Sequence, residues 1–279
     1  MLKYLSIIII TSIFIVACDV IEPPYEEKPD VNVDTAARVV LLEEYTGFRC
    51  GNCPAAGEIA HQIKELYPNN VVLVSIHAGA LAMPTPQHKY NFISQTMKDL
   101  ENYFNIGWGV GTPNGLVDRV EYSDNLILPE SDWQAAVIER LKIPAIAKIE
   151  LSPKYNEFNK TISCDVKVKF LENNSSKFNI TLYVVEDSIV QYQTDYRKNP
   201  IDIYDYVHNN ILRDALTPSF GVALNTDDIK KDEEFTQSFN KQIPANADWR
   251  TEWIRIVAVL TVPEEGHAVY QAAEKYIKK

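Results

Sequence analysis

Two cysteines, Cys50 and Cys53, stand at the junction of two differently patterned segments. The apolar run over residues 39–46 is typical of a buried strand, and after Cys53 the apolar residues recur at helical spacing as far as Tyr67. This order places Cys50 just before the first helical turn, where unpaired backbone N–H groups and the helix dipole favour an anion. The pattern therefore predicts a Cys50 thiolate with a pKa below the ordinary value of about 8.5, and a Cys53 that resolves a mixed disulfide.

The same pair is compatible with two other structures. A permanent disulfide would stabilise the start of the helix and take no part in redox chemistry, although so short a loop gives little loop-closure stabilisation. Structural zinc usually needs four ligands, and the nearest histidines, His61, His77 and His88, have no second Cys-x-x-Cys to join. We therefore predict a redox pair, no metal and no cofactor. A redox pair predicts one exposed sulfur and an easily reduced disulfide, whereas an inert clip predicts a shielded one.

The elements around the cysteines alternate in type. β-Branched runs predict strands, helical periodicity predicts helices, and both kinds follow one another between residues 38 and 142. The expected strands are 39–46, 71–77 and 116–120, and the expected helices are 53–67, 89–104 and 131–141. Strand, helix and strand in this order imply a right-handed parallel crossover and an α/β sheet.

Residues 37–144 resemble a thioredoxin-fold domain. Glu44 stands six residues before Cys50, where thioredoxins carry a buried acid, and Gly111-Thr112-Pro113 resembles the cis-proline loop of that fold. Side chains alternate along a strand, so only one of Glu43 and Glu44 is expected to face inward, and the resemblance selects Glu44.

This resemblance implies roles for three residues. A buried Glu44 would have a raised pKa and would take the proton of Cys53 during exchange. The backbone of Thr112, before a cis Pro113, would pair with an extended substrate peptide. The alternative is an ordinary trans proline in a glycine-rich turn.

The whole layout also resembles the lipoprotein family related to outer membrane protein 28. The resemblance rests on the signal described below, an acidic tether, the run Tyr45-Thr46-Gly47-Phe48-Arg49-Cys50-Gly51-Asn52-Cys53-Pro54 and a β-rich second half. It implies a place in the cell envelope, in the outer membrane of a Gram-negative bacterium. The dipeptide Gly51-Asn52 departs from the Gly-Pro of thioredoxin, which leaves the direction of redox chemistry open.

Four further residues are candidates for contact with a substrate. Tyr45, Phe48 and Trp108 are expected either as apolar walls of a peptide groove or as packing. His77 ends a predicted strand, and the carboxyl ends of strands are where α/β sheets place ligand contacts. A satisfied histidine without function is the alternative for His77.

The amino-terminal residues predict a signal peptide and a lipid anchor. Residues 1–17 form a short apolar signal that ends before Cys18 and resembles a lipobox, so Cys18 is the expected site of lipidation. An ordinary secretory signal is the alternative. Residues 18–36 are acidic and proline-rich and are expected to form a tether. The net charge of −11, with no basic stripe, argues against binding to nucleic acid.

The second half, residues 145–279, changes pattern. Residues 161–170 alternate between apolar and polar side chains, and similar short runs predict an antiparallel β-sandwich. Cys164 falls on the apolar side and is expected in the core. Residues 191–220 are expected to be a long tyrosine-rich loop, either a contact surface or packing between domains. The end of the chain, 264–279, fits either a helix or an edge strand.

Two functions follow from these observations. The first is an anchored thiol–disulfide oxidoreductase, in which Cys50 attacks, Cys53 resolves, Glu44 manages the proton, and Thr112 and Pro113 position the substrate. Its partners would be protein disulfides or dithiols of the envelope and the membrane itself. The second is a non-catalytic surface lipoprotein, an adhesin or a module that binds peptide or glycan, with the thioredoxin-like domain as scaffold.

Overall fold

The first half of the chain builds a parallel pair of strands with a helix between them. In the computed structural model, which describes residues 37–278, β1 (Val40–Thr46) leads through the cysteines into α1 (Cys53–Leu66) and on to β2 (Val71–His77). β1 and β2 are parallel, and β3 (Asn114–Val117) pairs antiparallel with the other edge of β1. The signal 1–17 and the whole tether 18–36, with Cys18, lie outside the described residues.

Helices cover both faces of β1. α1 and α3 (Trp133–Leu141) pack with Val40 and Leu42 in one hydrophobic core, while α2 (Gln95–Phe104) packs with Leu41 and Tyr45 in another. The predicted helix over 89–104 begins only at Gln95, because the Ser94 hydroxyl accepts a hydrogen bond from the Met97 N–H and caps it there. Short 3₁₀ turns also occur at Ala80–Ala82, Glu130–Asp132, Thr251–Trp253 and Pro263–Glu265.

The second half consists of strands joined by turns. They are β4 (Ala147–Asn156), β5 (Thr161–Phe170), β6 (Asn179–Glu186), β7 (Ile189–Thr194), β8 (Asp202–His208), β9 (Ile211–Ala215), β10 (Val222–Ala223), β11 (Glu234–Gln242), β12 (Ile254–Val262) and β13 (Ala268–Tyr276). The predicted loop over 191–220 is therefore wrong: most of it is strand, because β-branched and aromatic side chains suit paired strands. At the chain's end β13 pairs with β12 alone and is an edge strand.

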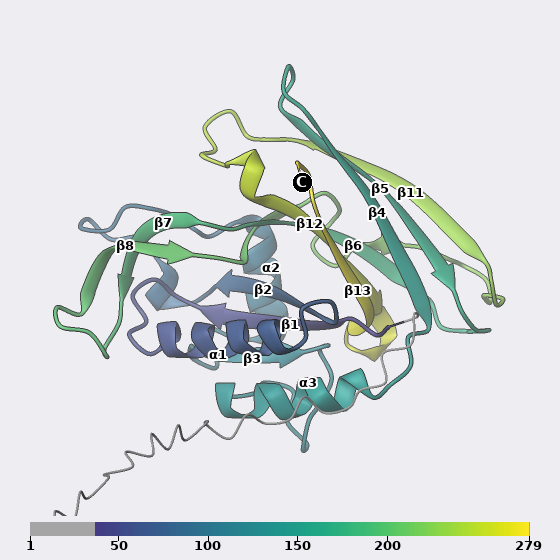
Figure 1. Ribbon diagram of the computed structural model, residues 1–279, viewed down its shortest axis with the longest axis horizontal. Helices are drawn as coiled ribbons and strands as arrows, with labels where there is room; N and C mark the ends of the chain where they lie inside the picture. The colour runs from purple at the N-terminus through teal and green to yellow at the C-terminus, as the bar shows by residue number, and fades with distance from the viewer. Residues whose placement is uncertain (1–36, 279) are drawn as a thin grey trace, which may run out of the picture. The chain divides into compact units, whose positions relative to one another are not determined.

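One sheet runs through both halves. Its eight strands follow the order β13-β12-β6-β9-β2-β1-β3, with β10 paired to β6. The junction is β9, which pairs parallel with β2 at Ser75 and Ile211 and antiparallel with β6 (Figure 1). The predicted division after residue 144 thus falls between elements that share a sheet. The described fold is mixed α/β, with most of its regular structure in strands.

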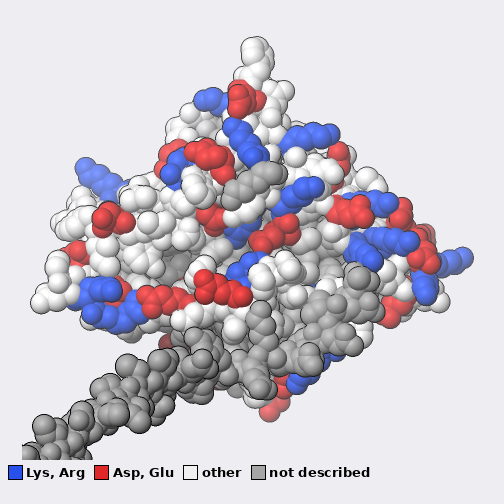
Figure 2. Space-filling model, viewed as in Figure 1, with Lys and Arg blue, Asp and Glu red and all other residues white. Residues whose placement is uncertain are grey.

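A second sheet, β11-β5-β4, lies over the carboxyl-terminal part of the first. Val166 and Val168 of β5 share a hydrophobic core with Leu182 of β6 and Ile256 of β12. Cys164 is buried in the same core, as predicted. Charged residues pair across the strands of this sheet, as between Lys167 and Glu234, and Figure 2 shows acidic and basic side chains intermingled over this part of the surface.

Strands β7 and β8 form a separate two-stranded sheet. We call residues 189–208 the β7–β8 hairpin. Figure 1 shows it beside the large sheet, with its connecting loop reaching toward the start of α1. This element positions several residues of the candidate site.

Candidate functional site

The site is built on a tight turn between β1 and α1, which we call the cysteine turn (residues 47–53). The Cys50 N–H donates to the Gly47 carbonyl at 2.9 Å, and the Cys53 N–H donates to the Cys50 carbonyl at 3.2 Å. α1 begins at Cys53, with Pro54 in its first turn, where a missing N–H costs nothing. Cys50 and Cys53 are joined by a disulfide at the start of the helix.

The loop before β3 lies against this disulfide. The Thr112–Pro113 peptide is cis, as the resemblance to the thioredoxin fold implies, and the Thr112 carbonyl oxygen is 3.7 Å from Cys50 Sγ. Residues separated by about 60 positions in the chain therefore meet at one sulfur.

Both cysteines are shielded from solvent. Cys50 is 3% exposed and Cys53 is 2% exposed, so the exposed sulfur expected of a redox pair is not found in this structure. The β7–β8 hairpin packs on the cysteine turn: the Thr194 N–H donates to the Phe48 carbonyl, and the Tyr196 N–H donates to the Gly51 carbonyl. The shielded disulfide thus lies between the loop before β3 and the hairpin, a segment that sequence patterns assign to a loop.

Glu44 is buried beneath the turn. Burial raises the pKa of this carboxyl to about 7, although the hydrogen bond that Glu44 accepts from the Ser75 hydroxyl partly opposes the shift. Glu44 and Cys53 both line a pocket of about 400 Å³, which extends along α1 past Gly57 and His61. A carboxyl that titrates near neutral pH, in the same pocket as a cysteine, is suited to exchange protons with it.

Glu43 is buried as well, which contradicts the prediction that only one of the two acids faces inward. The two side chains do point to opposite faces, but β1 is covered on both. Glu43 makes a bidentate ion pair with Arg119, at 2.6 and 2.8 Å, and Arg119 also donates to the Tyr183 hydroxyl. The pair satisfies a charge that burial alone would penalise.

Two of the candidate substrate contacts are buried in this structure. Tyr45 and His77 have no exposed surface, and His77 stacks on Phe92 with ring centroids 4.0 Å apart. The His77 ring packs against Phe92, before α2, and against His208, at the end of β8. Tyr45 shares its hydrophobic core with residues of α2.

The two remaining aromatic candidates differ. Phe48 is buried and lines a second pocket of about 220 Å³, together with His88, Tyr192 and Tyr204. Trp108 is 67% exposed, in the loop that leads to Thr112. Trp108 is therefore available to a binding partner, whereas Phe48 is reached only through that pocket.

Sequence reasoning missed three residues of the site. Gln193, 3% exposed, donates from its side chain to the Cys50 carbonyl at 3.0 Å and to the Gly47 carbonyl at 3.3 Å. Tyr196 lies on Gly51, and Arg197 forms a bidentate ion pair with Glu58 on α1. Alternating β-branched and aromatic residues in 189–208 could have predicted the hairpin, but no local signal links it to the cysteines.

No metal site accompanies the cysteines. Within residues 37–278 no three histidine, cysteine or acidic side chains gather as metal ligands do. In the same part of the chain no helix is long and apolar enough to cross a membrane.

The strand, the Cys-x-x-Cys turn, the helix and the cis-proline loop belong to a mixed α/β fold that has a large β-rich second half. The chain belongs to the Omp28 family, because the family model described as outer membrane protein Omp28 matches residues 98–279. Membership places the protein in the outer membrane of the cell envelope. The match covers the cis-proline loop and the β7–β8 hairpin but begins after the cysteines.

Solved structures agree at the level of the fold. HBP35 of Porphyromonas gingivalis is 19% identical, with a TM-score of 0.64 over 87% of this chain and 76% of that one. Protein AGR_C_4864 from Agrobacterium tumefaciens is 12% identical, with a TM-score of 0.52 over 88% of this chain and 96% of that one.

A third structure, a domain of the outer membrane lipoprotein Omp28 from Porphyromonas gingivalis, is 18% identical, with a TM-score of 0.30 over 48% of this chain and 88% of that one. No curated protein matches the chain.

Proposed function

We propose that this protein is an outer-membrane lipoprotein, anchored through a lipidated Cys18, whose Cys50–Cys53 pair exchanges disulfides with envelope proteins. The observation that carries the proposal is the position of Cys50 Sγ, 3.7 Å from the Thr112 carbonyl beside the cis Pro113. A client chain that pairs with the Thr112 backbone would bring its own sulfur to Cys50. Trp108, exposed in the same loop, would form one wall of its binding surface.

The exchange starts from the oxidised pair. A client thiolate attacks Cys50 Sγ, which forms a mixed disulfide and breaks the Cys50–Cys53 bond, and Cys53 leaves as a thiolate. The second client thiolate then attacks the client sulfur of the mixed disulfide, so the client gains a disulfide and Cys50 leaves as a thiolate. The reverse sequence reduces a client disulfide, and in both directions the two electrons pass only between the pair and the client.

Glu44 holds the proton of the resolving cysteine. With a pKa of about 7 the carboxyl can protonate the Cys53 thiolate as it leaves and can remove that proton in the reverse step. The shared pocket of about 400 Å³ provides room for water between the two groups and bulk solvent.

A second function, a non-catalytic surface lipoprotein, is favoured by one observation. Both sulfur-bearing residues are at most 3% exposed, as expected of a disulfide that only clips the start of α1. In that case the second half, with its tyrosine-rich surface on the β7–β8 hairpin, would carry the binding activity.

We also propose a division of labour within the chain. Residues 37–144 act as the thioredoxin-like domain, and residues 145–279 form an antiparallel β-sandwich that selects clients or spaces the site from the membrane. The core shared by β5, β6 and β12 supports the sandwich.

Replacement of Cys53 by serine tests the two functions. In Cys53→Ser the Cys50 thiolate can attack a client disulfide, but no Cys53 thiolate follows to resolve the mixed disulfide. The variant should therefore accumulate covalent client adducts in cells, visible on non-reducing gels and released by reductant. Cys50→Ser/Cys53→Ser is the matched control and should trap nothing. If Cys53→Ser yields no Cys50-dependent adduct and the purified wild type reduces no protein disulfide, the non-catalytic function holds.

A further inference from the structure

We infer that the β7–β8 hairpin is an autoinhibitory cover for the Cys50–Cys53 disulfide, fixed at its base and displaceable at its tip. The inference rests on the proposed function in one respect, because a cover regulates exchange only if exchange takes place. Its physical content, that the hairpin limits access to the disulfide, stands independently of the client.

The tip of the hairpin forms backbone hydrogen bonds with the cysteine turn. The Thr194 N–H donates to the Phe48 carbonyl at 2.9 Å and the Tyr196 N–H to the Gly51 carbonyl at 3.0 Å. Both acceptors flank Cys50, so an extended client chain that approached the turn would compete for the same two carbonyls. The hairpin therefore occupies the turn in the manner of an internal strand.

Two side chains complete the contact. The amide of Gln193 reaches the Cys50 carbonyl itself, from a position that is almost fully buried. The ring of Tyr196 lies so close to Gly51 that a Cβ added there would be 2.4 Å from it. Glycine at position 51 thus permits the ring to close over the turn, while Tyr196 itself stays 63% exposed.

A surface ion pair latches the tip to α1. Arg197 contacts both carboxylate oxygens of Glu58, at 2.7 and 2.9 Å, and also pairs with Asp195. The Arg197 and Glu58 side chains are 41% and 60% exposed, and exposed pairs of this kind contribute little free energy. The latch is therefore easy to open.

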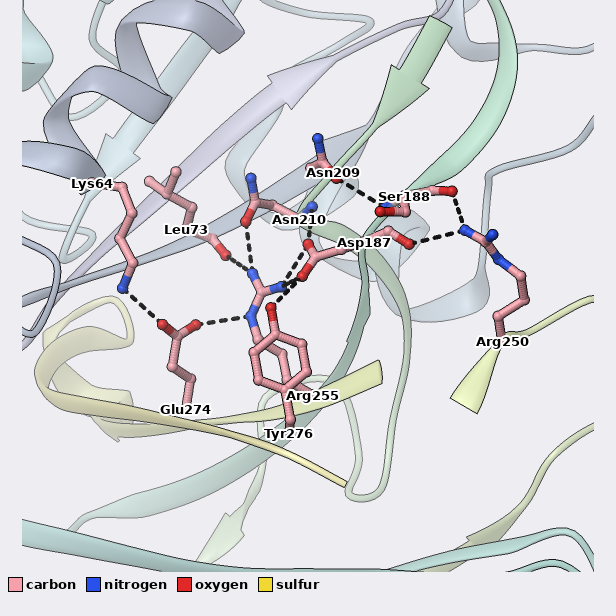
Figure 3. A network of polar contacts seen from close by, with 10 residues as sticks. All are labelled: Lys64, Leu73, Asp187, Ser188, Asn209, Asn210, Arg250, Arg255, Glu274 and Tyr276. Atoms are coloured by element: carbon pink, nitrogen blue, oxygen red, sulfur yellow. Dashed lines mark hydrogen bonds and ion pairs between the residues drawn. The ribbon is translucent and has the colours of Figure 1, made fainter. Parts of the chain in front are cut away.

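The base of the hairpin is held far more firmly. Arg255, 3% exposed on β12, donates to both carboxylate oxygens of Asp187 and to the Asn210 side chain. Asp187 in turn accepts from the Asn210 N–H, and the Asn209 side chain accepts from the Ser188 N–H (Figure 3). These residues flank the hairpin at both ends, so its base is tied to the sheet.

Between base and tip the hairpin is free of other strands. Within the described chain β7 and β8 pair only with each other, so the tip can move away without breaking a hydrogen bond of the eight-stranded sheet. A buried ion-pair cluster at one end and two backbone hydrogen bonds with an exposed latch at the other define a hinged cover.

The rate at which the phosphine TCEP reduces the Cys50–Cys53 disulfide measures this cover directly. In the full mature chain Arg197→Ala should accelerate reduction about threefold, because the latch is an exposed pair. Tyr196→Ala/Arg197→Ala should accelerate it about tenfold, since the ring over Gly51 is lost as well. The double variant Glu58→Ala/Arg197→Ala should be reduced little faster than Arg197→Ala alone, because both substitutions remove the same ion pair.

Lys167→Ala is the matched control, since it removes an exposed ion pair on the distant three-stranded sheet and should leave the rate unchanged. Unaltered reduction rates in folded Tyr196→Ala/Arg197→Ala protein would overturn the cover. Faster phosphine reduction without any trapped client would retain the cover and reject the proposed exchange. Trapped clients together with an unaltered rate of phosphine reduction would retain the proposed exchange and reject the cover.

Discussion

Glu44 shows how one residue combines a structural cost with a chemical use. Its carboxyl is buried next to Ser75, and burial raises its pKa to about 7. The folded state therefore favours the neutral acid, and this contribution to stability is fully present below about pH 4.5. It is lost as the pH rises through about 7, because the folded protein must then hold a buried charge.

Glu44→Gln should abolish this dependence. The glutamine side chain has the same shape and still accepts from Ser75, so the variant should be more stable than the wild type at pH 8 by about 2 kcal/mol. At pH 5 the two proteins should be nearly equal. Urea denaturation at both pH values measures the difference, and an equal offset at pH 5 and pH 8 would contradict a buried, titrating Glu44.

The corrected residues follow the same logic of burial. Tyr45 was a candidate for an apolar groove wall, His77 was a candidate because it ends a strand, and Glu43 was expected to face solvent because side chains alternate along a strand. Each lies on a strand that other elements cover on both faces, and Glu43 is tolerated there because Arg119 pairs with it. The exposure of a strand residue thus depends on which other elements pack on the strand. The sequence pattern of the strand itself carries no information about those elements.

At the scale of elements, the most important contact is the packing of the β7–β8 hairpin on the cysteine turn. The turn supplies carbonyls and a glycine, and the hairpin supplies two N–H groups and a tyrosine ring. Because Gly51 has no side chain, the fit depends on that residue as much as on Tyr196.

Gly51→Ala should therefore lift the tip of the hairpin. The added methyl group cannot coexist with the Tyr196 ring at 2.4 Å, so the ring and its backbone must shift. Amide hydrogen exchange should report this as faster exchange at Thr194 and Tyr196, by about tenfold, with Val257 in the centre of β12 unaffected. Unchanged exchange at both hairpin amides would show that the ring yields without moving the strand.

At the scale of the molecule, the two halves are joined by β9 and by a buried polar cluster. Arg255 of β12 donates to the Leu73 carbonyl of β2, to Asp187 and to Glu274, which also pairs with Lys64 of α1 (Figure 3). One arginine from the second half thus contacts β2 of the first half directly and α1 through Glu274 and Lys64. The halves are expected to unfold together.

Arg255→Leu tests this coupling. Removal of Arg255 leaves Asp187 without its cation and Glu274 with Lys64 as its remaining ion-pair partner, so the free energy of unfolding should fall by about 3 kcal/mol. Fluorescence and circular dichroism should follow a single, earlier transition in guanidinium chloride. Lys167→Ala, which breaks an exposed ion pair, should leave the free energy of unfolding nearly unchanged. Two separate transitions in the wild type would contradict a coupled fold.

Much of this architecture was accessible from the sequence because its signals are local. The strand 71–77, the strand 161–170 and the helix that starts at Cys53 coincide with β2, β5 and α1, since side-chain periodicity follows from each element's own geometry. The Cys-x-x-Cys spacing was visible in the sequence itself, whereas the position of Glu44 and the Thr112–Pro113 loop were singled out by the resemblance to the thioredoxin fold. The resemblance to the family related to outer membrane protein 28 predicted the location in the outer membrane.

Tertiary structure alone decided the exposure of the disulfide. The hydrogen bond from Gln193 to Cys50 joins residues 143 positions apart, and nothing in either segment's pattern specifies the other. The same holds for β9, which inserts beside β2 and fuses the two halves into one sheet. Short-range periodicity determines which elements form, whereas packing between distant segments determines which of their groups solvent and clients can reach.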